Sequence, residues 1–108
     1  MGVVSAGTGT QTAVIDTEHT LDTESTAGVY TLCVDTKNMV AGDIVVLRIK
    51  TKFAAGGTSG IAFEATYANV QAEPLKYSPP VPIITEIVCT LEQTDGVGRD
   101  FPWNLLRI

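Results

Sequence analysis

Few side chains in this sequence could do chemistry, and they are scattered along the chain. There is one histidine, His19, and there are two cysteines, Cys33 and Cys89. A Cys-His nucleophile needs a third group to orient the histidine, and no local signature places one beside either cysteine. His19 falls on the strand face expected to be interior, where a histidine is usually structural. The protein is therefore predicted not to be an enzyme.

The spacings that mark metal and phosphate sites are absent from the sequence. It contains no Cys-x-x-Cys, His-x-x-x-His or Asp-x-Asp-x-Asp-Gly pattern, although zinc sites and EF-hand calcium sites are built on such spacings. The glycine clusters around residues 7–9, 56–60 and 96–98 include no Gly-Lys-Ser/Thr sequence, so they indicate turns rather than phosphate-binding loops. We expect neither a metal nor a cofactor.

Acidic residues dominate the first third of the chain, which as a whole has a net charge of -5. Residues 1–36 contain no Lys or Arg. Alternation along residues 12–24 places a set of acids on one strand face, namely Asp16, Glu18, Asp22 and Glu24. This acidic face is either solvated, which also resists edge-to-edge aggregation, or holds a cation at a subunit contact.

Three of the basic residues form a stripe on one face of another predicted strand: Arg48, Lys50 and Lys52. The stripe is either an ordinary solvent face or a docking surface for an acidic partner, including the acidic strand of a neighbouring copy. An acidic chain without a longer basic run lacks the charge that phosphate-backbone binding needs. We therefore expect no direct contact with nucleic acid.

The elements that position these side chains are predicted to be strands. Thr, Val and Ile make up about a third of the residues, and such side chains favour a pleated surface. Apolar and polar residues alternate over residues 12–24, 29–35, 43–53, 61–67, 83–92 and 101–108. With Gly-rich and Pro-rich turns between them, these strands predict an all-β antiparallel sandwich of about six to eight strands, jelly-roll or immunoglobulin-like.

The two ends of the chain are unusual. Residues 1–11 are rich in glycine and small polar residues and are predicted to be a flexible arm, with residues 12–108 as a single β-sandwich domain. The C-terminal segment stays apolar to its last residue and either packs in the core or contacts a partner. Together with the basic stripe, the ends supply the candidate partner-binding residues, namely Val3, Val4, Arg48, Lys50, Lys52, Phe101 and Trp103.

The start of the chain has no basic segment followed by an apolar run, and no apolar stretch approaches the length of a membrane span. The protein is therefore expected to be made in the cytosol and not to bind a membrane. Disulfides are rare in a reducing compartment, so Cys33 and Cys89 are expected to remain small, partly buried thiols. A bridge between them stays open because the sequence does not give their separation.

Four stretches of the chain carry a family resemblance: Ala27–Met39, Gly42–Ile49, Ala65–Ala68 and Gly98–Trp103. They resemble small proteins encoded in the head-gene modules of tailed bacteriophages, several of which are capsid decoration, or cement, proteins. The resemblance covers residues 12–108 and rests on strand and turn sequences without a catalytic motif.

This resemblance implies a virion structural protein with a β-sandwich or jelly-roll fold and no cofactor. Such a protein sits on the outside of the head and clamps neighbouring subunits of the major capsid protein, commonly as a trimer or dimer. It would be made in the host cytoplasm and end on the capsid surface. Multivalent contacts across the lattice would strengthen its attachment.

Two other functions remain open at this point. One is a carbohydrate-binding or host-adhesion module in which Trp103, Tyr67 or Tyr77 forms an exposed stacking platform for sugars. The other is a tail or neck component of the same virion, which would differ from a decoration protein only in its location.

Overall fold

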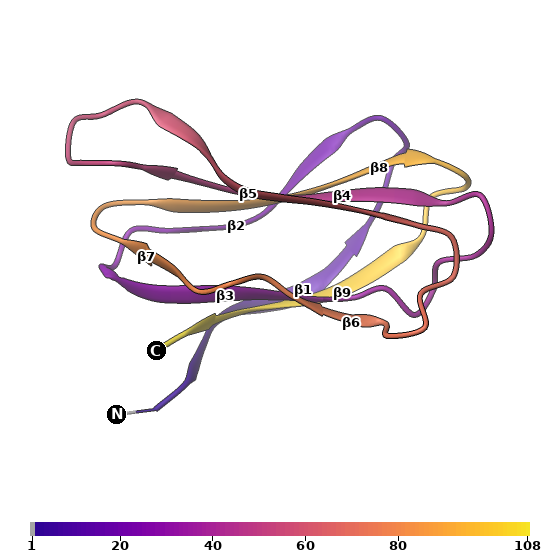
Figure 1. Ribbon diagram of the computed structural model, residues 1–108, viewed down its shortest axis with the longest axis horizontal. Coiled ribbons are helices and arrows are strands. Elements are labelled where there is room, and N and C mark those ends of the chain that lie inside the picture. Colours follow the sequence, from indigo (N-terminus) through magenta and orange to yellow (C-terminus); the bar gives the residue numbers. More distant parts are fainter. Residues whose placement is uncertain (1) are drawn as a thin grey trace.

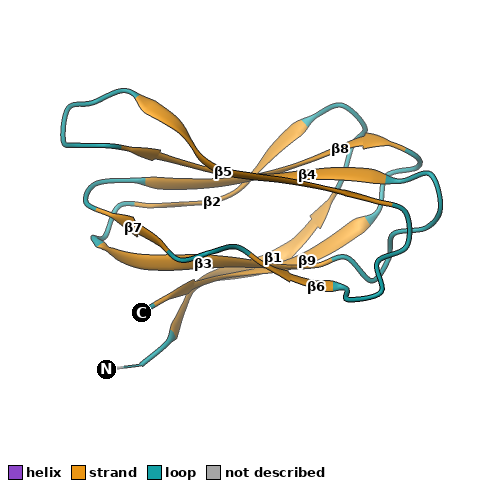
Figure 2. Cartoon of the chain, viewed as in Figure 1, coloured by secondary structure: helices purple, strands orange, loops and turns teal. Residues whose placement is uncertain are grey.

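Two antiparallel β-sheets pack face to face in the computed structural model of the protein, which describes residues 2–108 (Figure 1). Within these residues every regular element is a strand (Figure 2). The predicted all-β sandwich is confirmed. The strands are β1 (Val4–Thr12), β2 (Glu18–Glu24), β3 (Gly28–Asp35), β4 (Ile44–Lys52), β5 (Ser59–Ala68), β6 (Leu75–Tyr77), β7 (Val81–Ile83), β8 (Ile87–Asp95) and β9 (Asp100–Arg107).

The strands divide between the sheets in an order that differs from their order in sequence. Sheet A has the order β1-β9-β3-β6, and β7 also pairs with β3. Sheet B has the order β2-β8-β4-β5. Both chain termini lie at one end of the sandwich, and the loops after β1, β3, β5 and β8 gather at the other end (Figures 1 and 2). We call the latter the loop end; it consists of residues 13–17, 36–43, 69–74 and 96–99.

The core fills the space between the sheets with side chains from the inner face of each. Sheet A contributes alternate residues of β3 and β9, and sheet B contributes alternate residues of β4 and β8. This is the pattern that period 2 demands of a sandwich with one solvated face per sheet. The largest of the fully buried apolar side chains are Tyr30, Leu32, Ile49, Ile87, Leu91, Phe101 and Leu105.

Phe101 does not act as a partner contact, because its side chain is 0% exposed within the core. Trp103 also packs against the core and is only partly accessible. A Cβ at Gly9 would lie 3.3 Å from the Trp103 ring, so the glycine lets β1 pass close over the indole. Of the two alternatives for the apolar C-terminal segment, packing in the core is the one that the structure shows for these two residues.

The structure differs from the expected free arm at the N-terminus. Residues 4–12 form β1, which pairs antiparallel with β9 from Val4 opposite Arg107 to Thr12 opposite Asp100. Ser5 Oγ also donates a hydrogen bond to Asn104 of β9 at 2.6 Å. Backbone pairing and polar side chains therefore hold this segment. Its sequence shows no alternation of large apolar residues, so it lacked the signal by which the other long strands were predicted.

A bulge corrects the predicted acidic face of β2. The register of β2 against β8 shifts between Thr20 and Asp22, and a one-residue shift turns the following side chains to the other face. Asp22 and Glu24 are consequently opposite Cys89 and Ile87, which are fully buried. These two acids lie toward the space between the sheets, whereas Glu18 stays on the outer face.

Candidate functional site

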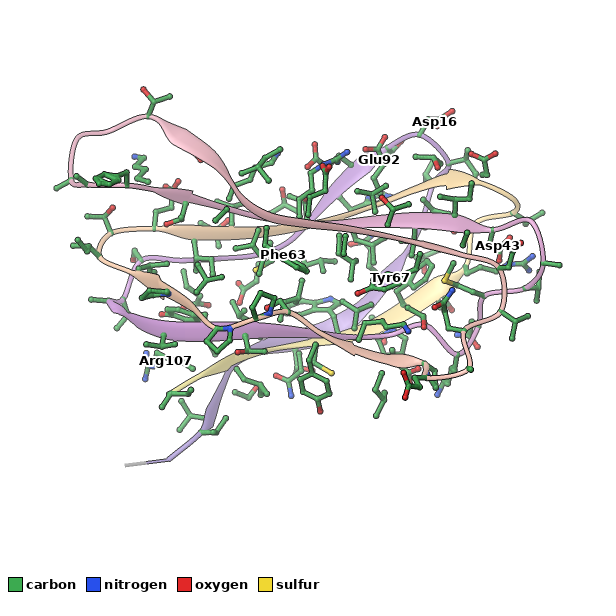
Figure 3. All side chains as sticks on the ribbon, viewed as in Figure 1. Asp16, Asp43, Phe63, Tyr67, Glu92 and Arg107 are labelled. Atoms are coloured by element: carbon green, nitrogen blue, oxygen red, sulfur yellow. The ribbon has the colours of Figure 1, made fainter. Side chains whose placement is uncertain are left out.

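The outer face of sheet B carries a network of ion pairs centred on Arg48 of β4. The Arg48 guanidinium lies 2.6 Å from Glu64 of β5, 2.9 Å from Glu92 of β8 and 3.4 Å from Glu18 of β2. Lys50 Nζ lies 2.9 Å from the same Glu18 carboxylate. Glu92 projects outward from the sheet (Figure 3). Each strand of sheet B thus contributes a charged side chain to this face.

The network shifts the pKa values of its members in the directions that pairing predicts. Hydrogen bonds from Lys50 and then Thr90 lower the pKa of Glu18 to about 2. Hydrogen bonds to Glu92 and Glu64 raise the pKa of Arg48. The acidic strand and the basic stripe, predicted as separate surfaces, lie in one sheet with β8 between them. Glu18 reaches across β8 to pair with Arg48 and Lys50. Arg48 and Lys50 are therefore already occupied and are poor candidates for binding an acidic partner.

Lys52 and Phe53 lie beyond this network, where the β4–β5 hairpin extends past the rest of the sandwich (Figure 1). Among the described residues, no carboxylate forms an ion pair with Lys52. The neighbouring Phe53 is 89% exposed. Of the three stripe residues, Lys52 alone is available to a partner.

The outer face of sheet A contrasts with this charged surface. One row of side chains crosses four strands: Thr8 lies opposite Asn104, which lies opposite Cys33, which lies opposite Tyr77. A hydrogen bond with Cys33 raises the pKa of Tyr77. Neighbouring rows add Thr10 opposite Pro102, Thr31 opposite Leu106, Asp35 opposite Leu75 and Val29 opposite Pro82.

Charge is confined to one end of this face. Its acidic residues are Asp35 and Asp100, the last residue of β3 and the first of β9, both next to the loop end. Asp35 is paired with Lys37 at 3.8 Å. The rest of the face is uncharged and includes Tyr77, which is 59% exposed, whereas Leu75, 54% exposed, lies opposite Asp35.

A shallow depression of about 230 Å³ lies on the outer face of sheet A, lined by Thr8, Cys33, Asp35, Pro102, Trp103 and Asn104. An exposed surface with few charges and with aromatic and aliphatic side chains resembles the centre of protein interfaces. In the sequence, this weakly charged surface corresponds to the outward-facing residues of β3 and β9, which alternate with the core residues. It could not be recognised without knowing that β1, β9, β3 and β6 are neighbours, because this strand order joins residues as distant in sequence as Val4 and Arg107.

The loop end is held together by buried polar contacts and presents four exposed valines on four loops: Val14, Val40, Val70 and Val97. Beneath them the buried Asp43 carboxylate binds Arg99 at 2.8 Å (Figure 3). The buried Gln93 side chain donates to the carbonyl oxygens of Asp95 and Val97. These valines were not predicted as a group, because their loops are separated in sequence and none carries a motif.

The chemically reactive residues take structural positions. His19 Nε2 accepts a hydrogen bond from the Val14 backbone at 3.0 Å. Both cysteines are free thiols; Cys33 lies on the outer face of sheet A and Cys89 is buried in the core. Burial raises the pKa of Cys89 to about 12, which suppresses its thiolate.

Residues 2–108 contain neither a metal-binding cluster nor a membrane-spanning helix. No group of three or more His, Cys, Asp and Glu side chains is arranged to hold a metal ion. No helix long and apolar enough to cross a membrane is found in this part of the chain.

The aromatic residues considered for sugar stacking do not form one platform. Trp103 is packed under β1. Tyr67 projects from β5 into the space between the sheets (Figure 3), and Lys76 Nζ lies 4.8 Å from the centre of its ring. Tyr77 is the exposed member of the three.

The predicted partner-binding residues fall in separate places. Val3 and Val4 are exposed, and Val4 lies opposite Arg107 near the end of β9. The basic stripe is on sheet B, and the C-terminal aromatics are in or against the core. The structure therefore does not bring them together into one site. It offers instead the outer face of sheet A as the candidate binding surface.

Comparison with known proteins does not assign the chain to a family. No protein-family model, no curated protein and no solved structure matches the chain.

Proposed function

We propose that the protein is a structural binding protein that attaches to a larger assembly through the outer face of sheet A. Following the sequence resemblance, this assembly is the outside of a tailed-phage head and the partner is the major capsid protein. The observation that carries the proposal is the nearly uncharged outer face of sheet A in a chain whose net charge is -5.

Charge distribution supports this choice of face. Docking removes water from both surfaces, and an unpaired charge in the contact costs several kcal/mol. On sheet B, docking would desolvate the whole Arg48 network. On sheet A it would cover threonine, proline, asparagine, leucine and tyrosine side chains, most of which carry either no polar group or one that can hydrogen-bond a partner.

The size of the face indicates that attachment depends on many copies binding together. The molecule measures 41 × 30 × 19 Å, and its shortest axis runs across the strands, since the view down that axis shows both sheets edge-on (Figure 1). The 41 Å length includes the β4–β5 hairpin of sheet B (Figure 1), so the face of sheet A is smaller than 41 × 19 Å and falls below the about 800 Å² per partner of a specific interface. Repetition over a capsid lattice would add stabilisation, because each bound copy favours the lattice state that has the complete site.

Two measurements on the virion test this function. Mass spectrometry of purified virions is expected to find the protein at a copy number comparable with that of the major capsid protein; a few copies would indicate a tail or neck component. Purified protein added to undecorated heads is expected to co-sediment with them and to raise their melting temperature. Absence from virions, or neither co-sedimentation nor a thermal shift, would refute the proposal.

A further inference from the structure

Each sheet of a sandwich has two edge strands, whose unpaired backbone groups can accept another strand unless they are protected. In this protein the edges of sheet A are β1 on one side and the short β6 and β7 on the other. The edges of sheet B are β2 and β5. These four edges differ in how they are protected.

Three of them carry features that prevent pairing. β6 and β7 have three residues each and lie in a segment with Pro74, Pro79, Pro80 and Pro82, which lack a backbone donor. β2 is interrupted by the bulge before Asp22 and has two acids beyond it. β1 has a register shift between Ser5 and Gly7, and Asp22 of the neighbouring β2 lies against it at Gly7.

β5 has almost none of these features. It is ten residues long, Ser59–Ala68, and contains no proline, lysine or arginine. Its register against β4 shifts near Ala62, which leaves residues 63–68 regular. Its one charged side chain, Glu64, is already paired with Arg48 at 2.6 Å. An edge that is regular over residues 63–68 and nearly uncharged, in a protein that protects its other edges, indicates a strand-pairing site.

We propose that β5 pairs antiparallel with β5 of a second copy of the protein. The two-fold axis lies midway between the two strands and places Ala65 opposite Ala65 of the partner subunit, which is what we call an axis at Ala65. The pairing would join the two copies of sheet B into one continuous eight-stranded sheet. A two-fold axis makes this contact self-complementary, so that each β5 supplies the same groups to the other.

The side chains select this register. Inner-face residues must lie opposite inner-face residues. The register must therefore place one residue directly opposite the same residue of the partner subunit. An axis at Glu64 would place the two Glu64 carboxylates opposite each other, which is unfavourable. An axis at Phe63 would place Glu64 opposite the irregular Ala62. An axis at Thr66 would place Phe63 opposite Asn69, which lies beyond the end of β5.

An axis at Ala65 avoids these faults. Glu64 then lies opposite Thr66 of the partner subunit, whose hydroxyl can donate to the carboxylate. Phe63 lies opposite Tyr67 of the partner subunit, and such aromatic pairs stabilise antiparallel strands.

The partial burial of the Phe63 and Tyr67 side chains also supports a second β5 as the partner strand. Phe63 and Tyr67 point from β5 into the space between the sheets (Figure 3) but are only partly buried, because β5 is the last strand of its sheet. A second β5 placed alongside would cover this open side. The occupant is a strand of matching pattern, which the chain itself provides.

The pairing has a geometric consequence for docking. An axis perpendicular to the joined sheet keeps both copies of sheet A on the same side of the dimer. Two docking faces would then act together, and two linked contacts bind more tightly than one. This consequence rests on the proposed function, whereas the pairing itself does not.

Two substitutions at one exposed position test the pairing on the purified protein, without any capsid. Thr66→Lys places a positive charge opposite Glu64 of the partner subunit at two equivalent positions, and Thr66→Glu places a negative charge there. Sedimentation equilibrium is expected to show a dimer whose dissociation constant falls about fivefold with lysine and rises about fivefold with glutamate. A wild-type monomer at all concentrations, or equal effects of both variants, would overturn the proposal.

Crosslinking tests the register separately. In a Cys33→Ser background, Ala65→Cys is expected to form a disulfide-linked dimer on oxidation, because the two residues 65 face each other at the axis. Ala68→Cys, at the end of the same strand, is the matched control and is expected to stay monomeric. Equal crosslinking of the two variants, or none in Ala65→Cys, contradicts the register.

Discussion

Asp43 shows how single buried polar side chains hold the loop end together. Its carboxylate accepts hydrogen bonds from Arg99 and from the Val40 backbone, and its carbonyl oxygen accepts one from the Asn69 backbone. Burial acts to raise the pKa of Asp43, but the hydrogen bond from Arg99 and the other donors outweigh it, so the pKa is lowered. The partner Arg99 is far away in sequence, so nothing around Asp43 in the sequence predicted this ion pair.

Asp43→Asn is expected to destabilise the protein by about 3 kcal/mol at neutral pH, because it leaves Arg99 without its partner at a site where Asp43 is 1% exposed. A lowered pKa in the folded state means that this stabilisation is present above the unfolded value of about 4 and is lost as pH falls through the folded value. Urea unfolding at pH 7 and at pH 3 measures both effects.

The matched control for this variant is Asp95→Asn, at an exposed aspartate on the same end of the sandwich. Its unfolding free energy should stay within about 0.5 kcal/mol of the wild type. If Asp43→Asn is no more destabilising than this control, the ion pair does not support the loop end.

At the scale of elements, the sequence predicted strands wherever large apolar residues alternate. The prediction for residues 43–53 corresponds closely to β4, Ile44–Lys52. It failed for β1, whose pairing with β9 depends on backbone groups that every sequence has. It also failed to see the bulge in β2, since the alternation of acids continues through residues 16–24 and only the partner strand reveals the shift.

The bulge creates a carboxyl pair at the seam between β2 and β1. A hydrogen bond with Asp22 raises the pKa of Glu24, with burial and the charge of Asp22 acting in the same direction. Oδ2 of Asp22 is buried beside Gly7 of β1 and has no hydrogen-bond partner. A raised pKa in the folded state means that this pair stabilises the seam at low pH and that the contribution is lost as pH rises through the raised value.

Asp22→Asn is therefore expected to strengthen the seam at pH 7, because it removes one of two neighbouring negative charges and leaves a neutral side chain. Hydrogen exchange followed by mass spectrometry should show slower exchange of β1 amides by several-fold in this variant than in the wild type. Glu73→Gln, at an exposed acid on the loop end, is the control and should leave β1 unchanged. Faster exchange of β1 in Asp22→Asn would contradict this account.

At the scale of the whole molecule, charge differs between the two outer faces of the sandwich rather than along the chain. The outer face of sheet B carries the ion-pair network, and the outer face of sheet A is nearly uncharged. The sequence placed the acids of the first third apart from the basic stripe at Arg48, Lys50 and Lys52. Folding brings β2 and β4 into one sheet, where Glu18 meets Arg48 and Lys50. The composition of each strand was visible in the sequence, but strand order decides which charges meet, and that order is set by contacts between distant segments.

The central claim is that the outer face of sheet A binds the larger assembly, and a binding isotherm on undecorated heads tests it most directly. Thr10→Glu and Tyr77→Glu add a charge to this face at exposed positions of β1 and β6, and Thr23→Glu adds the same charge to the outer face of sheet B. The two sheet A variants are predicted to bind at least about tenfold more weakly than the wild type, since a charge would be buried without a partner. Thr23→Glu is predicted to bind like the wild type. Wild-type affinity in both sheet A variants, or a loss confined to Thr23→Glu, would contradict the claim.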